Sequence, residues 1–597
     1  MTGLRPLLGR LRDGVGATAV LFAALVAGCW IYTSTGGAAR DLLVQELLIN
    51  LVLVLGLQIF IGNTGILSFG HLAFTQIAAY GTALTLIPAA TKATSLPDIP
   101  FDLGGVELGP VWATTVGVVV AVLVGGVVGT AIARAGGLAA TMISLAVLFV
   151  VDQVVKSWQE LTRGAGGLAS VPRLATNTPL WVVAAGALAV AHLFRTSRTG
   201  RFAVAGREDE IAAPAIGISL FWTRWMSWVA SIAVVAVAGA LRVQAVGSTN
   251  PKQYTLDVGV LLLAMLVAGG MRTVSGAFVG TVVITVGNEA ARQFGDRHEI
   301  ARLPDLFLGV VLLAVMLLRP GGLLGDADLA ATMARWWRGR DGPVPAAAIA
   351  PAEAPTPVGP LSADDVVVRF GGFLALDGAG FRIGPGEVVG LIGPNGAGKT
   401  TLFNVVTGIV PEQSGRVRLG DRDLTAEPPH RIARAGLART FQNLRLFANL
   451  PVRENVELAA VAAATYRSHR PGPDVDALLA DAGLADVADR PAHTLDYGNQ
   501  RRLELARAAA MAPDYLLLDE PTSGMSDEES LAMVDQVRAT ARGVGAGVLV
   551  IDHDLAFITR ISDHVVVLAE GRVLAEGTPD AVRADPAVAA AYLGAEG

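Results

Sequence analysis

The sequence predicts a helical membrane domain with several spans, followed by a soluble α/β domain. Hydrophobic residues make up 52% of the 597 residues and charged residues only 16%, and the mean hydropathy is +0.52. Soluble domains average about a quarter charged residues, so part of the chain belongs in a bilayer. Long apolar runs follow one another up to about residue 320, and from residue 361 the composition becomes that of a soluble domain.

Ten apolar runs in the first half are candidates for membrane helices. A helix needs about 20 apolar residues to cross a bilayer core, and the shorter runs can be re-entrant or broken. Arginines precede the first run as in a signal peptide, but more runs follow, so we expect a first membrane helix and not a cleaved leader. The runs are 17–35, 42–61, 66–88, 111–133, 137–155, 177–194, 225–246, 256–271, 274–290 and 303–318.

Positive charges in the short loops predict the orientation of these helices. The N-terminal arginines, Arg134, the cluster between Arg195 and Arg207, and Arg319 all follow an even number of predicted spans. Because Lys and Arg gather in cytoplasmic loops, this side is predicted to be cytoplasmic, and the second half of the chain lies on it. Asp152 and Lys156 are four residues apart in a run, which favours a local ion pair over a solute site.

A polar segment at residues 199–218 interrupts the membrane pattern on the predicted cytoplasmic side. Acidic residues suit the start of a helix here, and Gly217 suits its end. The segment is either a solvated loop or, since it resembles the Glu-Ala-Ala coupling loop of bacterial ATP-driven importers, a short helix that docks into a groove of an ATPase. Docking is favoured because a soluble domain follows on the same chain. The residues expected to dock are Glu208, Asp209, Glu210, Ile211, Ala212, Ala213 and Gly217.

Residues 321–360 have the composition of a connecting segment. Trp336 and Trp337 stand among arginines, which suits the cytoplasmic membrane interface. Residues 342–360 are rich in proline and alanine without apolar periodicity, which is typical of an extended tether. We therefore expect a membrane domain at 1–320 and a soluble domain at 361–597.

A glycine-rich turn follows the apolar run Val388–Ile392 and matches G-x-x-x-x-G-K-[ST] from Gly393 to Thr400. In this motif, backbone N–H groups and a helix N-terminus surround a phosphate chain. The lysine reaches the β- and γ-phosphates, and the threonine hydroxyl holds Mg²⁺. An ordinary tight turn is the alternative. The motif predicts ATP binding by Gly393, Pro394, Asn395, Gly396, Ala397, Gly398, Lys399, Thr400 and Thr401.

Further residues have the right chemistry to act on this nucleotide. An apolar run ends in Asp519, expected to hold Mg²⁺ through water, and Glu520, expected to activate the hydrolytic water. Gln442 can contact Mg²⁺ and that water. His553 ends another apolar run and can contact the γ-phosphate, although a lone histidine is more often structural. Phe370 precedes the phosphate loop and can stack on adenine, although a core role is the simpler interpretation of one phenylalanine.

Motifs in both halves resemble the ATP-binding-cassette (ABC) importers of branched-chain, or hydrophobic, amino acids. That family normally makes the permease and the ATPase as separate chains, so a fusion departs from its pattern. The resemblance implies a polytopic permease followed by an α/β P-loop nucleotide-binding domain of the ABC type. It rests on Asn63–Phe74, Arg207–Ala213, Gly269–Ala277 and Leu318–Gly325 in the first half, and on Thr440–Phe447, Gly498–Leu505, Asp519–Met525 and Ala591–Ala595 in the second.

By this resemblance, residues 495–500 stand at the family's signature loop, which binds the γ-phosphate of ATP held by the opposing subunit. The usual serine is Asp496 here, and a carboxylate is a poor partner for a phosphate. Asp496 either simply caps the following helix, which aspartate does well, or also weakens the composite ATP site. The loop consists of Leu495, Asp496, Tyr497, Gly498, Asn499 and Gln500.

The resemblance also implies an assembly and a mechanism. A working importer needs two permeases, two ATPases and an extracytoplasmic solute-binding protein, so this chain would join a second copy or different subunits in the bacterial cytoplasmic membrane. ATP hydrolysis by Glu520, His553, Gln442 and Lys399 would drive the membrane domain through the docking segment. Importers of urea or short-chain amides share this pattern. A membrane ATPase that transmits force without transport is a further alternative, and about ten spans argue against it.

Overall fold

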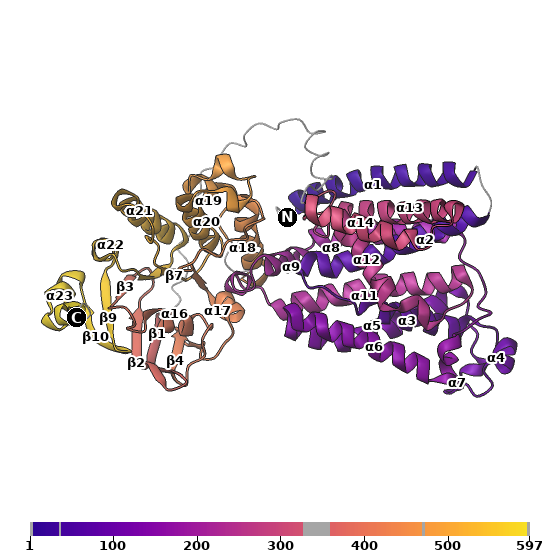
Figure 1. The fold of residues 1–597 in the computed structure, drawn as a ribbon. Coiled ribbons are helices and arrows are strands. Elements are labelled where there is room, and N and C mark those ends of the chain that lie inside the picture. Colours follow the sequence, from indigo (N-terminus) through magenta and orange to yellow (C-terminus); the bar gives the residue numbers. More distant parts are fainter. Residues whose placement is uncertain (1–3, 35–37, 326–358, 468–471, 594–597) are drawn as a thin grey trace. The chain divides into compact units, whose positions relative to one another are not determined.

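The computed structural model describes residues 4–34, 38–325, 359–467 and 472–593, which form two units (Figure 1). The first comprises Met1–Val204 and Phe221–Gly342, and the second comprises Ala205–Leu220 and Pro343–Gly597. Most of the expected connecting segment, with Trp336 and Trp337, lies outside the described residues. The predicted docking segment therefore belongs to the second unit, although it lies between two helices of the first in sequence.

The described part of the first unit consists of helices joined by loops. All ten predicted apolar runs are helical for most of their length. The helices are α1 (Leu4–Ser34), α2 (Ala38–Leu57), α3 (His71–Leu86), α4 (Ala89–Ser95), α5 (Pro110–Ala135), α6 (Gly137–Ser157), α7 (Gln159–Thr162), α8 (Asn177–Thr196), α9 (Arg198–Glu208), α11 (Leu220–Val246), α12 (Leu256–Gly269), α13 (Val274–His298) and α14 (Leu303–Leu318), with short turns η1 (Gln58–Gly62), η2 (Leu103–Gly105), η3 (Gly164–Gly166) and η4 (Pro251–Tyr254).

Seven helical segments among the described residues are long and apolar enough to cross a membrane. The pair α3 and α4 makes an eighth if it counts as one span, although it is bent by 110°. The two remaining predicted runs correspond to shorter apolar helices, Ala19–Ser34 and Leu303–Leu318. The ten predicted runs thus comprise seven full-length candidates, one bent pair and two shorter helices.

Helix α3 packs at close range against α5 and α11 through small residues. A Cβ atom on Gly117 of α5 would lie 2.4 Å from the Ala78 carbonyl oxygen of α3. Trp228 of α11 is fully buried, and its Nε1 donates to the Gly125 carbonyl at 2.9 Å. Glycine at these positions lets the backbones approach and lets the indole N–H reach a carbonyl within the apolar core.

Residues 65–70 interrupt the helical pattern before α3, and all but Gly65 lie within the predicted run 66–88. This segment is held by α6: the Phe69 N–H donates to Ser144 Oγ at 3.2 Å, and Thr141 Oγ1 donates to the Leu67 carbonyl at 2.9 Å. Asn63 Nδ2 donates back to the Ile59 carbonyl at 2.9 Å. Non-helical backbone is tolerated at membrane depth when protein groups satisfy it, as they do here.

The second unit contains two sheets and a set of helices. Strands β1 (Leu361–Phe370), β2 (Phe373–Ile383), β4 (Ser414–Leu419) and β5 (Arg422–Asp423) form an antiparallel sheet in the order β2-β1-β4-β5. A second sheet has the order β10-β9-β3-β8-β7-β6, and its strands are β3 (Val388–Ile392), β6 (Leu437–Arg439), β7 (Tyr515–Asp519), β8 (Gly547–Ile551), β9 (His564–Ala569) and β10 (Arg572–Gly577).

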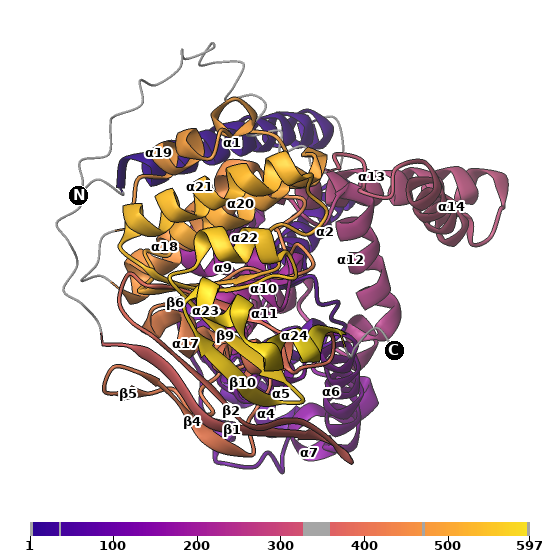
Figure 2. The same ribbon diagram turned by 90° about the vertical axis from the view of Figure 1, so that its left-hand side faces the viewer.

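Helices cover the large sheet and form the end of this unit that lies opposite the antiparallel sheet (Figures 1 and 2). In both views α19, α20 and α21 lie at one end, and β1, β2 and β4 lie at the opposite end (Figures 1 and 2). The helices are α10 (Ala212–Ala215), α16 (Lys399–Val406), α17 (Pro429–Ala435), α18 (Val452–Tyr466), α19 (Val475–Asp481), α20 (Tyr497–Ala509), α21 (Asp527–Val544), α22 (Leu555–Ile561), α23 (Pro579–Ala584) and α24 (Pro586–Leu593), with turns η5 (Ala485–Val487) and η6 (Ala492–Thr494).

The large sheet places several loops at one edge. Strands β3, β8, β7 and β6 are parallel neighbours, and every residue of β3, β7 and β8 is buried. Strands covered on both faces require continuous apolar runs, which explains why the sequence showed runs there and no alternation. The segments that follow the carboxyl ends of these strands therefore meet at the same edge of the sheet.

The docking segment differs from its predicted form. We expected one short helix from the acidic residues to Gly217, but Glu208 ends α9 and the helix α10 has only four residues. The Asp209 carboxylate accepts the N–H groups of Ile211 and Ala212, both at 2.7 Å. This side-chain turn competes with helical hydrogen bonding, so the helix starts later. Gly217 follows with φ +88, a conformation that favours glycine.

Candidate functional site

The glycine-rich turn lies between β3 and α16, at the carboxyl edge of the large sheet. Gly393 has φ +151, and a Cβ there would lie 2.1 Å from the Leu568 carbonyl oxygen. Gly398 has φ +97 and directly precedes α16. Lys399 Nζ donates to the carbonyl oxygens of Gly393 and Pro394 at 2.6 and 3.0 Å, so the lysine lies across the loop. The loop has the backbone and charge that a phosphate chain requires.

Asp519 ends β7 beside this loop, and Glu520 follows it directly. The residue Asp519 is 2% exposed, and its Oδ1 has no hydrogen-bond partner among the residues that the structure describes. Glu520 has φ +47, in the left-handed region, and its N–H donates to the Ile551 carbonyl of β8 at 2.8 Å. A non-glycine residue in this region is strained, and such strain gathers at functional sites.

Gln442 reaches Glu520 from the loop after β6. Its Nε2 donates to Glu520 Oε2 at 2.9 Å, although 78 residues separate them in the chain. The structure therefore brings Lys399, Gln442, Asp519 and Glu520 to one edge, as strand order dictates. Thr400, Asn395 and Gly396 are exposed on the same loop, whereas Ala397 is buried and its carbonyl accepts the N–H of Gly571 at 3.1 Å.

His553 and Phe370 lie at the margin of this group. The His553 side chain is 70% exposed, and its Nδ1 is 3.5 Å from Oδ1 of the buried Asp552. Asp552 also accepts from Thr522 Oγ1 at 2.6 Å, which ties the segment after β8 to the segment after β7. Phe370 is 51% exposed at the end of β1, so its ring has a free face and is not a core side chain.

Burial sets the electrostatics of the site. It raises the pKa of Asp519 to about 6, with Arg439 opposing the rise and Glu520 adding to it. Burial lowers the pKa of Lys399, and Glu520 opposes that shift. Arg439 Nη2 lies 3.7 Å from Asp519 Oδ2, and burial lowers the pKa of Arg439 to about 10. A buried carboxylate with a free oxygen beside a cationic loop can accept a divalent cation.

Residues 495–500 lie at the start of α20, and the last four of them form the first turn of this helix. Asp496 caps this helix, and its Oδ1 accepts the Asn499 N–H at 2.8 Å. That bond lowers the pKa of Asp496. Tyr497 is 43% exposed beside Gly524, and its hydroxyl accepts from Arg501 Nη2 at 3.1 Å. Leu495 is buried, Gly498, Asn499 and Gln500 are half-buried, and the Gln500 side chain donates to the Leu495 carbonyl at 2.9 Å.

The docking segment is bonded to the soluble part of its own unit. Arg445 Nη1 donates to Asp209 Oδ2 at 3.1 Å, and Asn449 Nδ2 donates to Glu208 Oε2 at 2.8 Å. Arg434 Nε donates to the Gly217 carbonyl at 2.9 Å, and its guanidinium lies 3.6 Å over the Tyr466 ring. Ala212 and Ala213 are buried, whereas Ile211 is 43% exposed.

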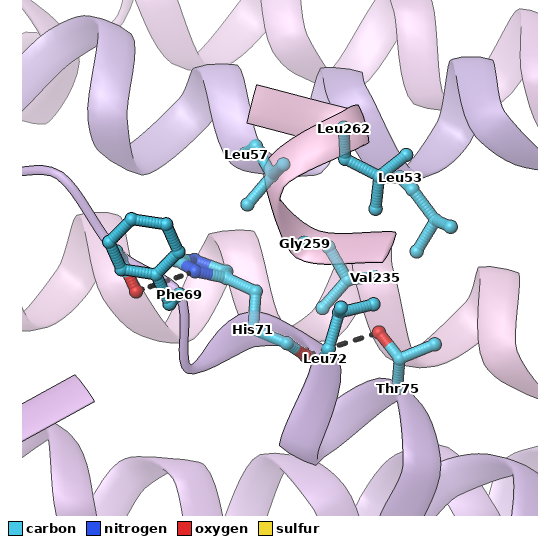
Figure 3. A pocket seen from close by; sticks show the side chains of 10 residues that line it. Leu53, Leu57, Phe69, His71, Leu72, Thr75, Val235, Gly259 and Leu262 are labelled. Carbon is cyan, nitrogen blue, oxygen red and sulfur yellow. Dashed lines mark hydrogen bonds between the residues drawn. The ribbon is translucent and has the colours of Figure 1, made fainter. Parts of the chain in front are cut away.

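A small cavity in the first unit lies beside the N-terminal end of α3 (Figure 3). His71 Nδ1 is 2.9 Å from Ser68 Oγ, and Thr75 Oγ1 donates to the His71 carbonyl at 3.1 Å. The volume is about 10 Å³, room for about one water molecule, so this cavity is too small for an amino acid. The cavity is lined by Leu53, Leu57, Ser68, Phe69, His71, Leu72, Thr75, Val235, Gly259 and Leu262.

The charged pair predicted in the membrane runs forms as expected. Lys156 Nζ lies 2.5 Å from Asp152 Oδ2, four residues away on α6. Sequence reasoning missed a different set of charges in the soluble unit: Arg439, Arg501, Glu504 and Arg507 are all buried. The backbone groups that Arg501, Glu504 and Arg507 bind lie about 60 residues away in the chain, so only the run Arg501–Arg507, with charges three residues apart, hinted at this cluster.

Comparisons with known proteins match both halves of the chain to one transport system. Residues 40–316 match the family model described as branched-chain amino acid transport system / permease component. Residues 376–523 match the model for ABC transporter, and residues 572–597 match branched-chain amino acid ATP-binding cassette transporter.

Curated relatives match the second half along nearly their whole length. The high-affinity branched-chain amino acid transport ATP-binding protein BraF of Pseudomonas aeruginosa is 39% identical over 248 residues, which cover 39% of this chain and 97% of BraF. LivG of Escherichia coli, with the same description, is 37% identical over 248 residues, with 97% of LivG covered. A solved ATP-binding cassette of an ABC transporter, in its ADP conformation, is 28% identical, with 40% of this chain and all of that chain covered and a TM-score of 0.35.

These matches agree with the geometry of the site. The phosphate loop, the strand-end carboxylates and the capped helix after residue 495 lie within or beside the matched ranges, and the apolar helices fill the matched permease range. The chain therefore belongs to the branched-chain amino acid transport family of ABC transporters, as a multi-pass membrane permease component fused to an ATP-binding ABC ATPase whose hydrolysis is coupled to transport.

Proposed function

We propose that this chain is the fused permease and ATP-binding subunit of an importer of leucine, isoleucine and valine. The observation that carries the proposal is the joint match of residues 40–316 and 572–597 to models for branched-chain amino acid transport, on one chain. The relatives BraF and LivG carry the same substrate in their descriptions. The site geometry supports an ATPase, and the substrate rests on these likenesses.

Around the nucleotide we assign roles by geometry. The loop from Gly393 to Thr401 would surround the phosphates, with Lys399 moving from its present carbonyl partners to phosphate oxygens. Phe370 offers its exposed ring to the adenine. The loop N–H groups and Lys399 would replace water around the phosphates, and the Phe370 ring would replace water on the base. These contacts favour binding of the triphosphate.

The residues present fit a Mg²⁺ ion. Asp519 has a buried oxygen without a partner, and Thr400 carries an exposed hydroxyl at the start of α16. The amide oxygen of Gln442 can also bind a cation, because Gln442 uses its Nε2 and not its oxygen in the bond to Glu520. Hard oxygen ligands of this kind suit Mg²⁺, which supplies positive charge that neutralises the phosphate oxygens.

Hydrolysis would use Glu520 as the residue that orients or activates water. The bond from Gln442 holds the Glu520 carboxylate, and the positive charge of Lys399 balances the negative charge of Glu520. His553 is exposed next to this edge and would contact the γ-phosphate. The strained backbone of Glu520 presents its side chain at the sheet edge instead of burying it.

Coupling to the membrane unit would run through the segment from Glu208 to Gly217. Its bonds to Arg445, Asn449 and Arg434 hold it to the ATPase, so a movement of that domain would be passed to α9 and α11, the helices on either side of it. The signature loop at 495–500 would meet the ATP of a second cassette, because the α20 N-terminus is a backbone anion site.

The assembly would contain a second permease and a second ATPase, or a second copy of this chain, with an extracytoplasmic solute-binding protein. It would lie in the bacterial cytoplasmic membrane with the ATPase in the cytoplasm, the compartment that holds ATP.

Uptake into proteoliposomes tests the proposal. The assembled transporter and its binding protein should take up labelled leucine, isoleucine or valine in an ATP-dependent way, and Lys399→Ala should abolish uptake. Uptake of labelled urea in place of these amino acids would overturn the substrate assignment. ATP hydrolysis without flux of any solute would overturn the importer assignment and favour a force-transmitting ATPase.

A further inference from the structure

Three buried charges on α20 face the segment 441–445. Arg501, Glu504 and Arg507 stand three residues apart, which places them side by side on the helix surface. Their side chains are at most 3% exposed. Glu504 Oε2 lies 3.1 Å from Arg501 Nη1, and Glu504 Oε1 lies 4.0 Å from Arg507 Nη2, so one carboxylate neutralises two guanidinium groups.

These three side chains bind the backbone of the facing segment. Glu504 Oε1 accepts the Phe441 N–H at 3.1 Å, and Arg501 donates to the Phe441 and Gln442 carbonyls, each at 2.6 Å. Arg507 Nη1 donates to the Arg445 carbonyl at 2.7 Å. The segment is thus fixed at both its ends, through atoms that do not depend on its own side chains.

The segment held in this way carries two functional contacts. Gln442 donates to Glu520 at 2.9 Å, and Arg445 donates to Asp209 at 3.1 Å. Gln442 belongs to the proposed hydrolytic group, and Asp209 belongs to the docking segment. The same five residues therefore touch the hydrolytic group on one side and the docking segment on the other.

Stability alone does not account for this cluster. Burial raises the pKa of Glu504, with Arg507 and Arg501 opposing that rise, and burial lowers the pKa of Arg507. Buried ion pairs are weak stabilisers, and apolar residues of similar volume often replace them without loss. A fully bonded polar cluster does, however, fix one arrangement of the groups that it binds.

We propose that Glu504 is a positioning residue that holds Arg501 and Arg507 against segment 441–445 and so sets Gln442 for hydrolysis and Arg445 for docking. The inference rests on the proposed roles of Gln442, Glu520 and the docking segment. In this proposal α20, which starts at the signature loop, supports both the contact of Gln442 with Glu520 and the contact of Arg445 with Asp209.

Steady-state ATP hydrolysis by the full-length chain in its purified assembly tests the inference. Glu504→Gln keeps the shape and the acceptor for Phe441 N–H but removes the charge that neutralises both arginines. Arg501→Lys keeps the charge balance, but one ammonium cannot bridge two carbonyls as a guanidinium fork does. Glu427→Gln is the matched control, since Glu427 pairs with Arg431 on the surface at 3.1 Å.

We expect both cluster variants to lower kcat roughly 10- to 100-fold, the scale of a small misplacement, with KM for ATP near that of the control. Glu504→Gln should also lower Tm, because it leaves two buried guanidinium groups without their counter-charge, whereas Arg501→Lys keeps the charge balance and should hold Tm closer to the control. KM should hold because the three side chains bond residues 441–445 and no residue of the phosphate loop. Control-like kcat in both variants would overturn the inference. A joint loss of kcat and ATP affinity in both variants would show a structural role only.

Two further variants separate this inference from the proposed function. Glu520→Gln and Gln442→Ala should lower kcat at least as far as Glu504→Gln does. If these two leave hydrolysis unchanged, the proposed roles at the ATP site fail, whatever Glu504→Gln does. If they lower kcat and Glu504→Gln does not, only the positioning role fails.

Discussion

Replacing Asp209 by asparagine isolates one contact between the docking segment and the ATPase. Asp209 Oδ1 accepts the N–H groups of Ile211 and Ala212 at 2.7 Å, and Oδ2 accepts from Arg445 at 3.1 Å. Asparagine keeps an oxygen for the turn and places an NH₂ group against the guanidinium. The turn therefore survives, and the bond to Arg445 does not.

The size of the effect follows from exposure. The Arg445 side chain is 36% exposed and that of Asp209 is 16% exposed, so solvent weakens the pair relative to a buried one. A charge-assisted hydrogen bond contributes about 1.5–3 kcal/mol when protected, and exposed pairs contribute less than 1. We expect a loss of about 1–2 kcal/mol in docking free energy, roughly a 5- to 30-fold shift toward the undocked state.

The assay is the number of labelled leucine molecules taken up per ATP hydrolysed in proteoliposomes. Asp209→Asn should lower this ratio while hydrolysis continues, because the residues at the phosphate loop are intact. Arg445→Gln should lower it similarly, and the double variant should add little, since both changes remove the same bond. An unchanged ratio in Asp209→Asn would refute the coupling role of this contact.

Three further predictions concern the ATP site and the membrane core. Burial raises the pKa of Asp519 to about 6, so its carboxylate becomes protonated below that pH. Mg²⁺-dependent binding of a fluorescent ATP analogue should therefore weaken about tenfold per pH unit below pH 6. Asp519→Asn should remove this pH dependence, and a flat profile in the wild type would contradict the role of Asp519 as a Mg²⁺ ligand. Asp496→Ser should leave Tm and ATP turnover unchanged because serine caps a helix about as well; a rise in turnover would show that the carboxylate weakens the composite site. Trp228→Phe should destabilise the membrane unit by about 1–3 kcal/mol, seen as a lower Tm in detergent, because the indole bond to the Gly125 carbonyl is lost and the smaller ring leaves a cavity in the core. An unchanged Tm would show that this bond and the packing of the indole contribute nothing.

The sequence allowed the prediction of features that depend on local pattern. The phosphate loop follows from glycines before Lys399, and the carboxylate edge follows from an apolar run that ends in Asp519 and Glu520. Parallel strands then had to bring these loops together, since their carboxyl ends share one edge. The cap at Asp496 also follows from residue type and position alone.

Features that depend on distant partners escaped prediction. The break at residues 65–70 is held by Ser144 and Thr141, about 75 residues away, and no local pattern reveals those partners. The four-residue length of α10 depends on the Asp209 side chain turning back on its own backbone. Burial of Glu504 could not be inferred, because a charged residue on a helix is normally taken for a solvated one.

The inclusion of Ala205–Leu220 in the second unit has a consequence for the order of events during synthesis. This stretch leaves the ribosome before any residue of the cassette. The docking segment therefore already exists when the cassette residues that bind it are synthesised. Arg434, Arg445 and Asn449 find their acceptors in a segment tethered between two membrane helices. A cassette produced without the first half would present these three side chains to water. The fusion thus supplies the docking segment at a high local concentration to the cassette made on the same chain.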